Sequence, residues 1–349
     1  MAAPTRQASG ARARPGGESG HGVKATRRGL VLGGGGVLGV AWMVGALQGL
    51  QDETGLDPRN FDVLLGTSAG SILVALLGAG VSAPDLVAHQ RGERLETGPL
   101  AGFDFDYENA SRGARAVHLR PGIGSRELLL HNARHLYHLP ATAVLSALLP
   151  EGWGNLGAVG TLISHVSPNG WPARAGVTIV ALDYETGERV VFGRAGSPVA
   201  TMPDAVMASC SIPGWYHPVK IGDHRYIDGG AWSSTNLDLL AGQGLDEIFV
   251  LAPQGSFDAG APTWWTTRLE RSWRANVTQR VIREMVTVHR DGAEVTILCP
   301  GQADLDAIGD NPMNVSRRLR VLETSLRTSG PGLHDPAPHP GVNDCPEAS

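Results

Sequence analysis

Short apolar runs alternate along this chain with segments of helical periodicity. Helical segments at 40–51 and 68–77 follow the first two runs, and a turn at 184–187 joins the third run to a hairpin partner at 189–192. This alternation predicts an α/β fold, with a parallel or mixed sheet covered by helices on both faces. The runs that have the length and composition of buried strands are residues 29–32, 61–65, 177–182, 248–251 and 295–298.

Residues 271–289 have the pattern of an amphipathic helix. Apolar side chains recur there every three or four residues, which is the spacing of one helix face. We expect this face to pack into the core and not to bind a partner. Its members are Trp273, Val277, Val281, Met285 and Val288.

The two ends of the chain lack such patterns. Residues 1–27 consist mainly of Ala, Gly, Arg, Ser and Pro, and residues 330–349 hold five prolines. We expect both to be disordered tails on either side of one catalytic domain at 28–329. Within that domain, residues 85–175 have a weaker pattern, which we interpret as a variable helical insertion or cap.

Three histidines at helical spacing lie in this insertion. His131, His135 and His138 have Arg126 and Arg134 nearby and suggest a metal site at first sight. The sequence offers no acidic partners at ligand spacing, so a polar helix face is the preferred interpretation and we expect no bound metal.

Composition adds limits on the class of protein. With 349 residues, 42% of them hydrophobic, the chain is long enough for one large α/β domain. Its net charge of −5 gives no indication of nucleic-acid binding. Residues 1–28 are basic, with six Arg or Lys against Glu18. A solvated arm is the preferred interpretation of this tail, and peripheral contact with an anionic membrane is the alternative.

Cysteine usage fits a reducing compartment, because there is no disulfide framework and no CxxC pair. The uncharged stretches 29–51 and 63–84 approach the length of a membrane span, but glycine clusters break both. Arg27 and Arg28 resemble a twin-arginine export signal. Cleavage after the apolar run 29–51 would, however, remove the glycine loop at 33–39, to which a role in catalysis is assigned below. We therefore expect a cytoplasmic protein that is not exported. The cysteines are Cys210, Cys299 and Cys345.

The sequence Gly66-Thr67-Ser68-Ala69-Gly70 matches G-x-S-x-G. The match gains weight from its position, directly after a predicted strand and before a predicted helix. A sharp strand-to-helix turn lifts a serine hydroxyl above the sheet, and Gly66 and Gly70 remove side chains that would clash there. The N–H groups at the helix start favour negative charge beside Ser68.

A second glycine loop, at 33–39, also joins a strand to a helix. Gly34, Gly36 and Gly39 fit the dinucleotide-binding fingerprint, but Asp62 lies at the wrong end of the next strand to hold a ribose. The other interpretation is an oxyanion hole, because consecutive glycines expose backbone N–H groups. A donor loop followed by a serine turn favours acyl transfer.

The third motif is Asp228-Gly229-Gly230. Together, the ordered set GGGVLG, GTSAG and DGG resembles the patatin-like phospholipase family. Residues 208–213 resemble the family's A-S-x-x-x-P block, and residues 183–187 resemble its hairpin. The resemblance covers roughly residues 29–252. It implies a three-layer α/β/α fold with a largely parallel central sheet.

The resemblance also implies the chemistry. Ser68 would be the nucleophile and Asp228 its general base, without a catalytic histidine, and the N–H groups of Gly34, Gly35 and Gly36 would bind the oxyanion. The substrate would be a lipid or phospholipid ester, and no cofactor is implied. The glycines that support the motifs are Gly39, Gly66, Gly70, Gly229 and Gly230.

Two positions depart from the family pattern. Leu38 stands where the family usually has Arg or Lys, and residues 233–238 replace an Asn-x-Pro-like segment after DGG. Three other interpretations stay open at this point. They are an α/β-hydrolase with a Ser–His–Asp triad, a nucleotide-binding oxidoreductase and a catalytically silent scaffold at a membrane surface. The histidines available to a triad include His217, His224 and His289.

Overall fold

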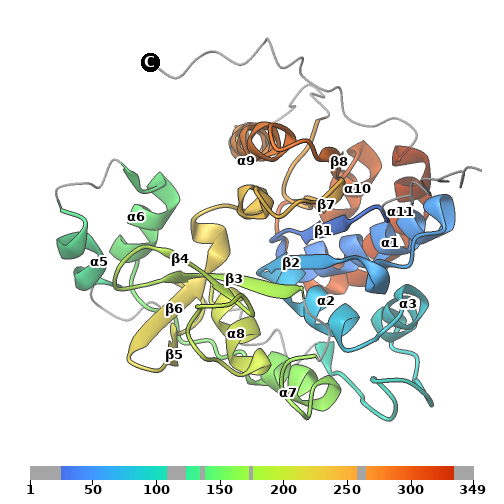
Figure 1. Cartoon of the computed structure of the whole chain (residues 1–349), viewed down its shortest axis with the longest axis horizontal. Helices are drawn as coiled ribbons and strands as arrows, with labels where there is room; N and C mark the ends of the chain where they lie inside the picture. The colour runs from blue at the N-terminus through green and yellow to red at the C-terminus, as the bar shows by residue number, and fades with distance from the viewer. Residues whose placement is uncertain (1–24, 108–122, 134–137, 173–175, 258–264, 334–349) are drawn as a thin grey trace, which may run out of the picture.

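The structure of this chain is a computed structural model (Figure 1), and it describes residues 25–107, 123–133, 138–172, 176–257 and 265–333. The strands are Arg28–Leu32 (β1), Val63–Thr67 (β2), Val177–Asp183 (β3), Arg189–Phe192 (β4), Val219–Ile221 (β5), His224–Asp228 (β6), Glu247–Leu251 (β7) and Glu294–Leu298 (β8).

Helices separate most of these strands. The α-helices are Gly36–Thr54 (α1), Ala69–Gly78 (α2), Ala83–Arg91 (α3), Arg126–His131 (α5), Ala141–Leu148 (α6), Gly157–Val166 (α7), Met202–Ser209 (α8), Trp265–His289 (α9), Gln302–Ile308 (α10) and Arg318–Gly332 (α11). Short 3-10 helices lie at Pro58–Asn60 (η1), Gly229–Ala231 (η4), Leu237–Leu240 (η5) and Val315–Arg317 (η6).

Within the described residues the strands form one eight-stranded sheet, in the order β5-β6-β3-β2-β1-β7-β8, with β4 paired to β3. The central strands β3, β2, β1, β7 and β8 are parallel, whereas β4, β5 and β6 pair antiparallel. Parallel strands end at the same edge, so the turns after β1 and β2 are neighbours. That edge carries the candidate site.

Each face of the sheet is buried under helices. Leu30 and Leu32 of β1 pack with α1, α2, α7 and α11 on one face, whereas Val31 packs with α9 and η5 on the other. The alternation follows from the strand period of two. The predicted three-layer α/β/α fold with a largely parallel sheet is therefore confirmed.

Helix α9 is longer than predicted, and its apolar stripe is buried only in part. Val281, Met285 and Val288 lie in the core as expected, but Trp273 is 45% exposed. The prediction that Trp273 packs in the core is therefore wrong. Helical periodicity indicates which side of α9 faces inward, but not how far along the helix the core extends.

The predicted insertion contains two kinds of helix. Helices α3 and α7 pack into the main core, whereas α5 and α6 pack with β3 and β6 in a smaller cluster that includes Leu128, Ala147 and Leu182. We call residues 123–133 and 138–153 the cap. Figure 1 shows it beside β4, on the side opposite to α1 and α11. His131 ends α5, and His135 lies outside the described residues.

The structure defines the C-terminal ends of α1 and α11. Helix α1 ends at Gly55, which has the left-handed φ of 69° that glycine adopts readily. Helix α11 continues through Gly332, past the start of the predicted C-terminal tail. Among the described residues, no helix has both the length and the apolar composition that crossing a bilayer requires.

Candidate active site

Ser68 lies in the turn between β2 and α2 and has an unusual backbone conformation. Its φ of 53° and ψ of −122° are unfavourable for a residue with a side chain. Gly66 and Gly70 make the turn possible. A Cβ at Gly70 would strike the Leu32 carbonyl of β1, and one at Gly66 would lie 2.7 Å from the Gly70 carbonyl oxygen. The strand–turn–helix unit predicted from the sequence is therefore present, with Ser68 at the start of α2.

Ser68 and Asp228 are in direct contact although 160 positions separate them in sequence. Ser68 Oγ donates a hydrogen bond to Asp228 Oδ2 at 2.6 Å, and both side chains are buried. The other carboxylate oxygen, Oδ1, accepts the Gly230 N–H at 2.7 Å. A carboxylate bonded directly to a hydroxyl is well positioned to take its proton. The fold thus brings together the two residues that the sequence suggested as nucleophile and base.

Burial also changes the acidity of this carboxyl group. It raises the pKa of Asp228 from 3.8 to about 6, while the hydrogen bonds from Ser68 and Gly230 oppose the rise. A general base works best when its pKa lies near the working pH. Around neutral pH, Asp228 is therefore ionised and still basic enough to accept a proton.

The C-terminal end of α8 and the residues just after it hold both Ser68 and Asp228 in position. Ser209 Oγ accepts the Ser68 N–H at 2.9 Å and donates to the Val180 carbonyl at 2.6 Å. The Ser211 carbonyl accepts the Asp228 N–H at 3.0 Å. The sequence resemblance included this segment but assigned no role to its serines. Their positions in a motif just before the aspartate were the only available signal.

The glycine loop after β1 lies beside the nucleophile. A Cβ built at Gly34 would be 3.3 Å from Ser68 Cβ. The Gly34 N–H donates to the Ser234 carbonyl at 2.8 Å, so it is not free to bind an oxyanion. The N–H groups of Gly35 and Gly36 have no hydrogen bond to another described residue. Of the three predicted oxyanion donors, these two are available.

The rest of the chain holds this loop at several points. The Leu38 N–H donates to the Pro312 carbonyl at 2.9 Å, and the Leu38 side chain is fully buried. A Cβ at Gly35 would lie 2.7 Å from Pro253 Cγ, and one at Gly39 would lie 3.4 Å from the same atom. The loop is thus anchored by backbone bonds and by packing against proline, with a buried leucine where the family usually has a basic residue.

The two glycines after Asp228 allow the chain to turn out of β6. A Cβ at Gly229 would lie 2.6 Å from the Val180 carbonyl oxygen. One at Gly230 would lie 3.0 Å from Asp228 Oδ1. A larger residue at either position would therefore press on the carboxylate or on the neighbouring strand.

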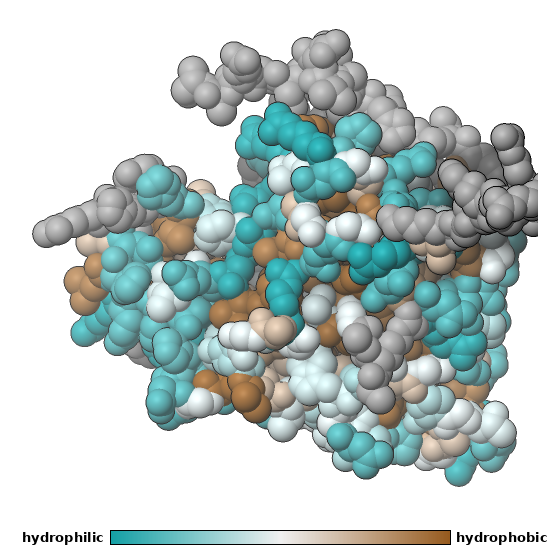
Figure 2. Space-filling model, in the orientation of Figure 1, coloured by the Kyte–Doolittle hydropathy of each residue, from teal (hydrophilic) through white to brown (hydrophobic). Residues whose placement is uncertain are grey.

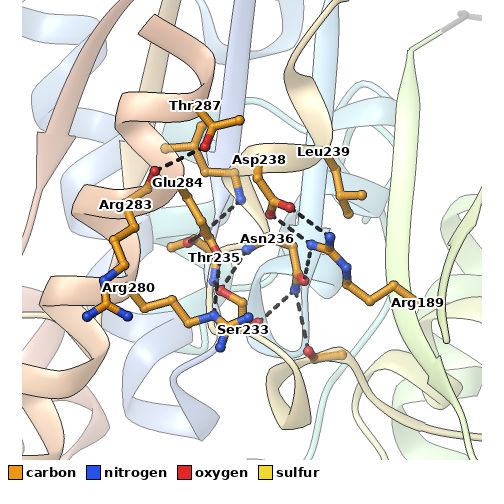
Figure 3. Close-up of polar contacts among 12 residues, drawn as sticks. Arg189, Ser233, Thr235, Asn236, Asp238, Leu239, Arg280, Arg283, Glu284 and Thr287 are labelled. Carbon is orange, nitrogen blue, oxygen red and sulfur yellow. Dashed lines mark hydrogen bonds and ion pairs between the residues drawn. The ribbon is translucent and has the colours of Figure 1, made fainter. Parts of the chain in front are cut away.

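Buried polar bonds hold the segment that follows this turn (Figure 3). Asn236 has a left-handed φ of 53°. Its Nδ2 donates to the Ser233 carbonyl at 2.7 Å and to Thr67 Oγ1 at 3.1 Å. Because Thr67 immediately precedes Ser68, Asn236 links the Asp228 loop to the nucleophile turn. This is the segment whose sequence departs from the family pattern, and it nevertheless supports the site.

Helix α9 supports the same segment from its other side. Glu284 Oε2 accepts hydrogen bonds from Thr235 Oγ1 at 2.7 Å and from the Leu237 N–H at 3.0 Å. Burial raises the pKa of Glu284, and these hydrogen bonds oppose the rise. Arg189 forms two bonds to the Asp238 carboxylate, at 2.8 and 2.7 Å, at the end of the segment (Figure 3). No local motif indicated either interaction.

An apolar cavity of about 120 Å³ has Ser68 in its wall. Ala69, Ile72, Leu73 and Leu76 line it along one side of α2, leading away from the nucleophile. A cavity of this composition suits a hydrocarbon chain. Further apolar lining residues are Val37, Val40, Leu86, Leu156, Val159 and Leu162.

Two of the three histidines that a triad could use have side chains that contact other groups. His224 Nδ1 pairs with Asp183 Oδ2 at 2.7 Å, and His289 Nδ1 lies 3.2 Å from the Ala293 carbonyl oxygen. The main-chain N–H of His217 donates to a backbone carbonyl. Ser68 Oγ contacts the Asp228 carboxylate instead.

The nucleotide-binding interpretation meets a similar obstacle. Asp62 Oδ2 accepts the Arg28 N–H at 2.7 Å, at the start of β1. The glycine loop follows the end of β1, so Asp62 is at the opposite edge of the sheet. It cannot hold the ribose of a nucleotide bound at that loop.

One group of described residues brings three atoms that could bind a metal within 4.8 Å of one another: Asp183, Glu185 and His224. Asp183 Oδ1 accepts the N–H groups of Glu185 and Thr186, both at 2.9 Å. Glu185 pairs with Arg225 at 2.7 Å. These bonds stabilise the β3–β4 hairpin and account for the cluster.

Comparisons with known proteins bear on this geometry. Residues 30–241 match the patatin-like phospholipase family. Uncharacterised NTE family proteins of Mycobacterium bovis and Mycobacterium tuberculosis are 25% identical to this chain over 229 residues. The match covers 66% of this chain but only 30% of each relative, so the chain spans less than a third of their length.

Two solved structures are also similar. VipD from Legionella pneumophila has a TM-score of 0.41 and 14% identity, with 89% of this chain and 67% of VipD covered. The type III effector ExoU has a TM-score of 0.36 and 16% identity, with 89% and 53% covered. The family match spans more than half of the chain and includes the glycine loop, the Ser68 turn and Asp228. The chain therefore belongs to the patatin-like phospholipase family, a family of lipase- and esterase-type hydrolases.

Proposed function

We propose that this protein is a lipid acyl hydrolase that cleaves carboxylic esters through an acyl-serine intermediate. Ser68 is the nucleophile and Asp228 is its general base. The observation that carries the proposal is the 2.6 Å hydrogen bond from Ser68 Oγ to Asp228 Oδ2, in the wall of an apolar cavity. The proposed reaction uses side chains, backbone N–H groups and water.

The first half of the reaction acylates the serine. Ser68 Oγ attacks the ester carbonyl carbon while Asp228 Oδ2 takes the hydroxyl proton. The carbonyl oxygen becomes an oxyanion in the tetrahedral intermediate. When this intermediate collapses, the bond to the alcohol oxygen breaks, and Asp228 returns the proton to that oxygen. The alcohol leaves and the acyl group remains on Ser68.

Backbone donors stabilise the oxyanion. The Gly35 and Gly36 N–H groups have no hydrogen bond to another described residue, and the loop lies against Ser68. Removing one such donor in other serine enzymes raises the barrier by about 3–4 kcal/mol. The start of α2 adds a favourable field, because the free N–H groups of a helix N-terminus favour negative charge.

The second half of the reaction releases the acid. A water molecule takes the position of the departed alcohol, and Asp228 accepts its proton as the water oxygen attacks the acyl carbon. Collapse of the second tetrahedral intermediate breaks the bond to Ser68 Oγ. The proton returns from Asp228 to this oxygen, and the carboxylic acid leaves. Both the serine and the aspartate are then restored.

The cavity suggests the substrate class. Its walls along α2 and α7 are apolar, so an acyl chain gains free energy by leaving water there. We propose a phospholipid or neutral lipid ester as the substrate. A panel of defined phospholipids and neutral esters, with the products identified by mass, tests this. Release of free fatty acid supports the proposal, and turnover of water-soluble esters alone would contradict the lipid assignment.

Labelling with a fluorophosphonate probe tests the nucleophile. We expect intact-protein mass to show one adduct on the wild type and none on Ser68→Ala. Ser146→Ala is a suitable control, because Ser146 is also a buried serine and its Oγ bonds to the Ala143 carbonyl, away from Ser68. It should label like the wild type. Stoichiometric labelling of Ser68→Ala would rule out Ser68 as the nucleophile.

A further inference from the structure

Large apolar side chains are exposed on the cap. Among the described residues, five of the eight exposed large hydrophobic side chains belong to this small region. Their exposed fractions range from 48% for Ile123 to 76% for Leu130. Figure 2 shows hydrophobic surface over α5 and α6, in the lobe at the left of the view. We call this set the docking face; its members are Ile123, Leu130, Leu145, Leu148 and Trp153.

Helix α6 has apolar residues on both of its sides. Ala143 and Ala147 are fully buried, whereas Leu145 and Leu148 are about half exposed. The segment 139–150 around this helix contains no charged residue. A surface helix normally carries polar residues on its solvent side. The apolar outer side of α6 therefore indicates a partner that is less polar than water.

Residues beside the docking face connect it to the candidate site at two points. Thr142 Oγ1, in the first turn of α6, donates to the Ala231 carbonyl at 2.6 Å, three residues after the proposed base. Trp153 is followed by Gly154, which pairs with Tyr216. The Tyr216 side chain lines the apolar cavity. The cap is thus tied to the loop of the base and to the cavity wall.

We propose that the docking face binds the surface of a phospholipid bilayer, from which lipid esters reach Ser68. This inference rests on the proposed function, since the bilayer is both the partner and the source of substrate. Apolar side chains on short amphipathic segments insert at the level where headgroups meet acyl chains. A tryptophan such as Trp153 suits that level, because its ring is apolar and its N–H is polar.

The sequence around the cap favours an anionic bilayer. In the sequence, residues 109–122, which lead directly to Ile123, contain three arginines and no acidic residue, whereas the described residues of the cap contain Arg126, Glu127 and Glu151. Basic residues near a membrane surface are attracted to anionic headgroups. We therefore expect stronger binding to vesicles of phosphatidylcholine mixed with phosphatidylglycerol than to vesicles of phosphatidylcholine alone.

Vesicle sedimentation with the full chain tests the proposal. In the double variant Leu145→Gln/Leu148→Gln, two aliphatic side chains become polar without a change in charge, and glutamine is a good helix former. We expect the partition coefficient onto mixed vesicles to fall by about tenfold or more, because two leucines no longer leave water. Turnover of a soluble short-chain ester should stay at the wild-type level.

A matched control is Val199→Gln. Val199 is 97% exposed and lies outside the cap, so this change removes an exposed aliphatic side chain from another part of the surface. Its vesicle binding should equal that of the wild type. If the double variant loses soluble-ester turnover, Leu130→Gln gives the same test at the most exposed position of the docking face.

Binding and chemistry can be separated in this experiment. Ser68→Ala should bind vesicles like the wild type, so docking is measured even if the proposed reaction is wrong. A wild type that binds vesicles but releases no fatty acid would contradict the proposed function alone. Equal vesicle binding by the double variant and the wild type would overturn the docking proposal. So would a wild-type dimer that the double variant converts to a monomer, because the face would then join two copies of the chain.

Discussion

The β1–α1 turn and the β2–α2 turn are neighbours at one edge of the sheet. They differ in the type of residue that adopts a positive φ. In the first turn, Gly36 adopts a φ of +62°, which glycine accepts without steric conflict. In the second, Ser68 adopts a φ of 53° although it has a side chain. A strained non-glycine residue persists only where its surroundings enforce the conformation.

The two turns also differ in the groups that hold them in place. Backbone carbonyls and a proline ring hold the glycine loop. Side chains hold the serine turn, because Ser209 bonds to the Ser68 N–H and Asp228 bonds to the Ser68 hydroxyl. The difference follows from the proposed chemistry. The first turn has only to present N–H groups, whereas the second has to present a reactive side chain and therefore cannot use glycine.

The largest loss of turnover is expected when Asp228, the proposed base of Ser68, is replaced. Asp228→Asn should lower turnover by about a thousandfold or more, because an amide cannot accept the hydroxyl proton. Steady-state kinetics on a soluble ester measure this, with circular dichroism to verify folding. Replacements of His217, His224 or His289 serve as controls and should retain most of the activity. If one of them abolishes turnover in a folded protein, the dyad mechanism is wrong.

The pH profile tests the same group without a mutation. Because the pKa of Asp228 is raised to about 6, kcat/KM should fall as the pH drops through about 6, where the base becomes protonated. Stability should change in the opposite direction. The folded state binds this proton more tightly than the unfolded state, so the contribution is full below pH 3.8 and is lost as the pH rises through about 6. A kcat/KM profile that stays flat between pH 5 and 8 would contradict this assignment.

The first turn should show a smaller effect. Gly36→Ala places a Cβ 2.7 Å from Met313 Sδ and strains a left-handed residue. We expect turnover to fall by about a hundredfold, as oxyanion donors shift. Gly55→Ala is the matched control, because Gly55 has a φ of 69° and open space around its Cβ. It should lose similar stability in chemical denaturation and keep full activity. Equal activity of the two variants would mean that the glycine loop has no catalytic role.

Replacement of Ser209, which accepts the Ser68 N–H, should lower turnover less than the changes above. Ser209→Ala leaves the buried Ser68 N–H without its acceptor, which costs about 1–3 kcal/mol of unfolding free energy. We expect turnover to fall by about tenfold as the hydroxyl loses its alignment. Ser211→Ala is the control, since the Ser211 hydroxyl donates to the Met207 carbonyl of α8 and not to the Ser68 turn. If both variants behave alike, the bond from the Ser68 N–H to Ser209 is unimportant.

The smallest expected effect is a difference in stability that reports the backbone strain at Ser68. Ser68→Gly and Ser68→Ala both remove the hydroxyl, and both should be inactive. Glycine is normally the less stable choice near a helix, but here it should be the more stable variant by about 1 kcal/mol, because it accepts a positive φ. Urea denaturation of the two proteins measures the difference. An alanine variant that is as stable as the glycine variant would show that the serine turn is not strained.

The parts of this site that the sequence predicted are those that depend on local spacing. Gly66 and Gly70 occur at fixed distances from Ser68, because each relieves a clash within the same turn or with the adjacent strand. The same holds for the two glycines after Asp228. These requirements act over a few residues, so they leave a readable motif.

The parts that the sequence did not predict depend on contacts between distant segments. Ser209 bonds to a residue 141 positions away, and Asn236 to one 169 positions away. Glu284 supports a segment 49 positions earlier from within an ordinary amphipathic helix. The Gly34 N–H was expected to be a free donor, but the Ser234 carbonyl occupies it. Only the folded chain determines such pairings, because many serines, asparagines and carbonyl groups could have made them.

The stretch 209–211, at the end of α8, has a consequence for how this family can diversify. This short stretch holds Ser68 through Ser209 and Asp228 through Ser211, so the separation of the two residues is set partly by these bonds. Strand β3 adds to this frame, because it pairs with the strands that carry both groups, whereas among the described residues the cap forms no hydrogen bond to Ser68, Ser209, Ser211 or Asp228. Insertions, deletions or exchange of whole helices there can alter which surface the protein meets while the reacting atoms keep their alignment. The cap is therefore the natural place to graft a new specificity onto this scaffold.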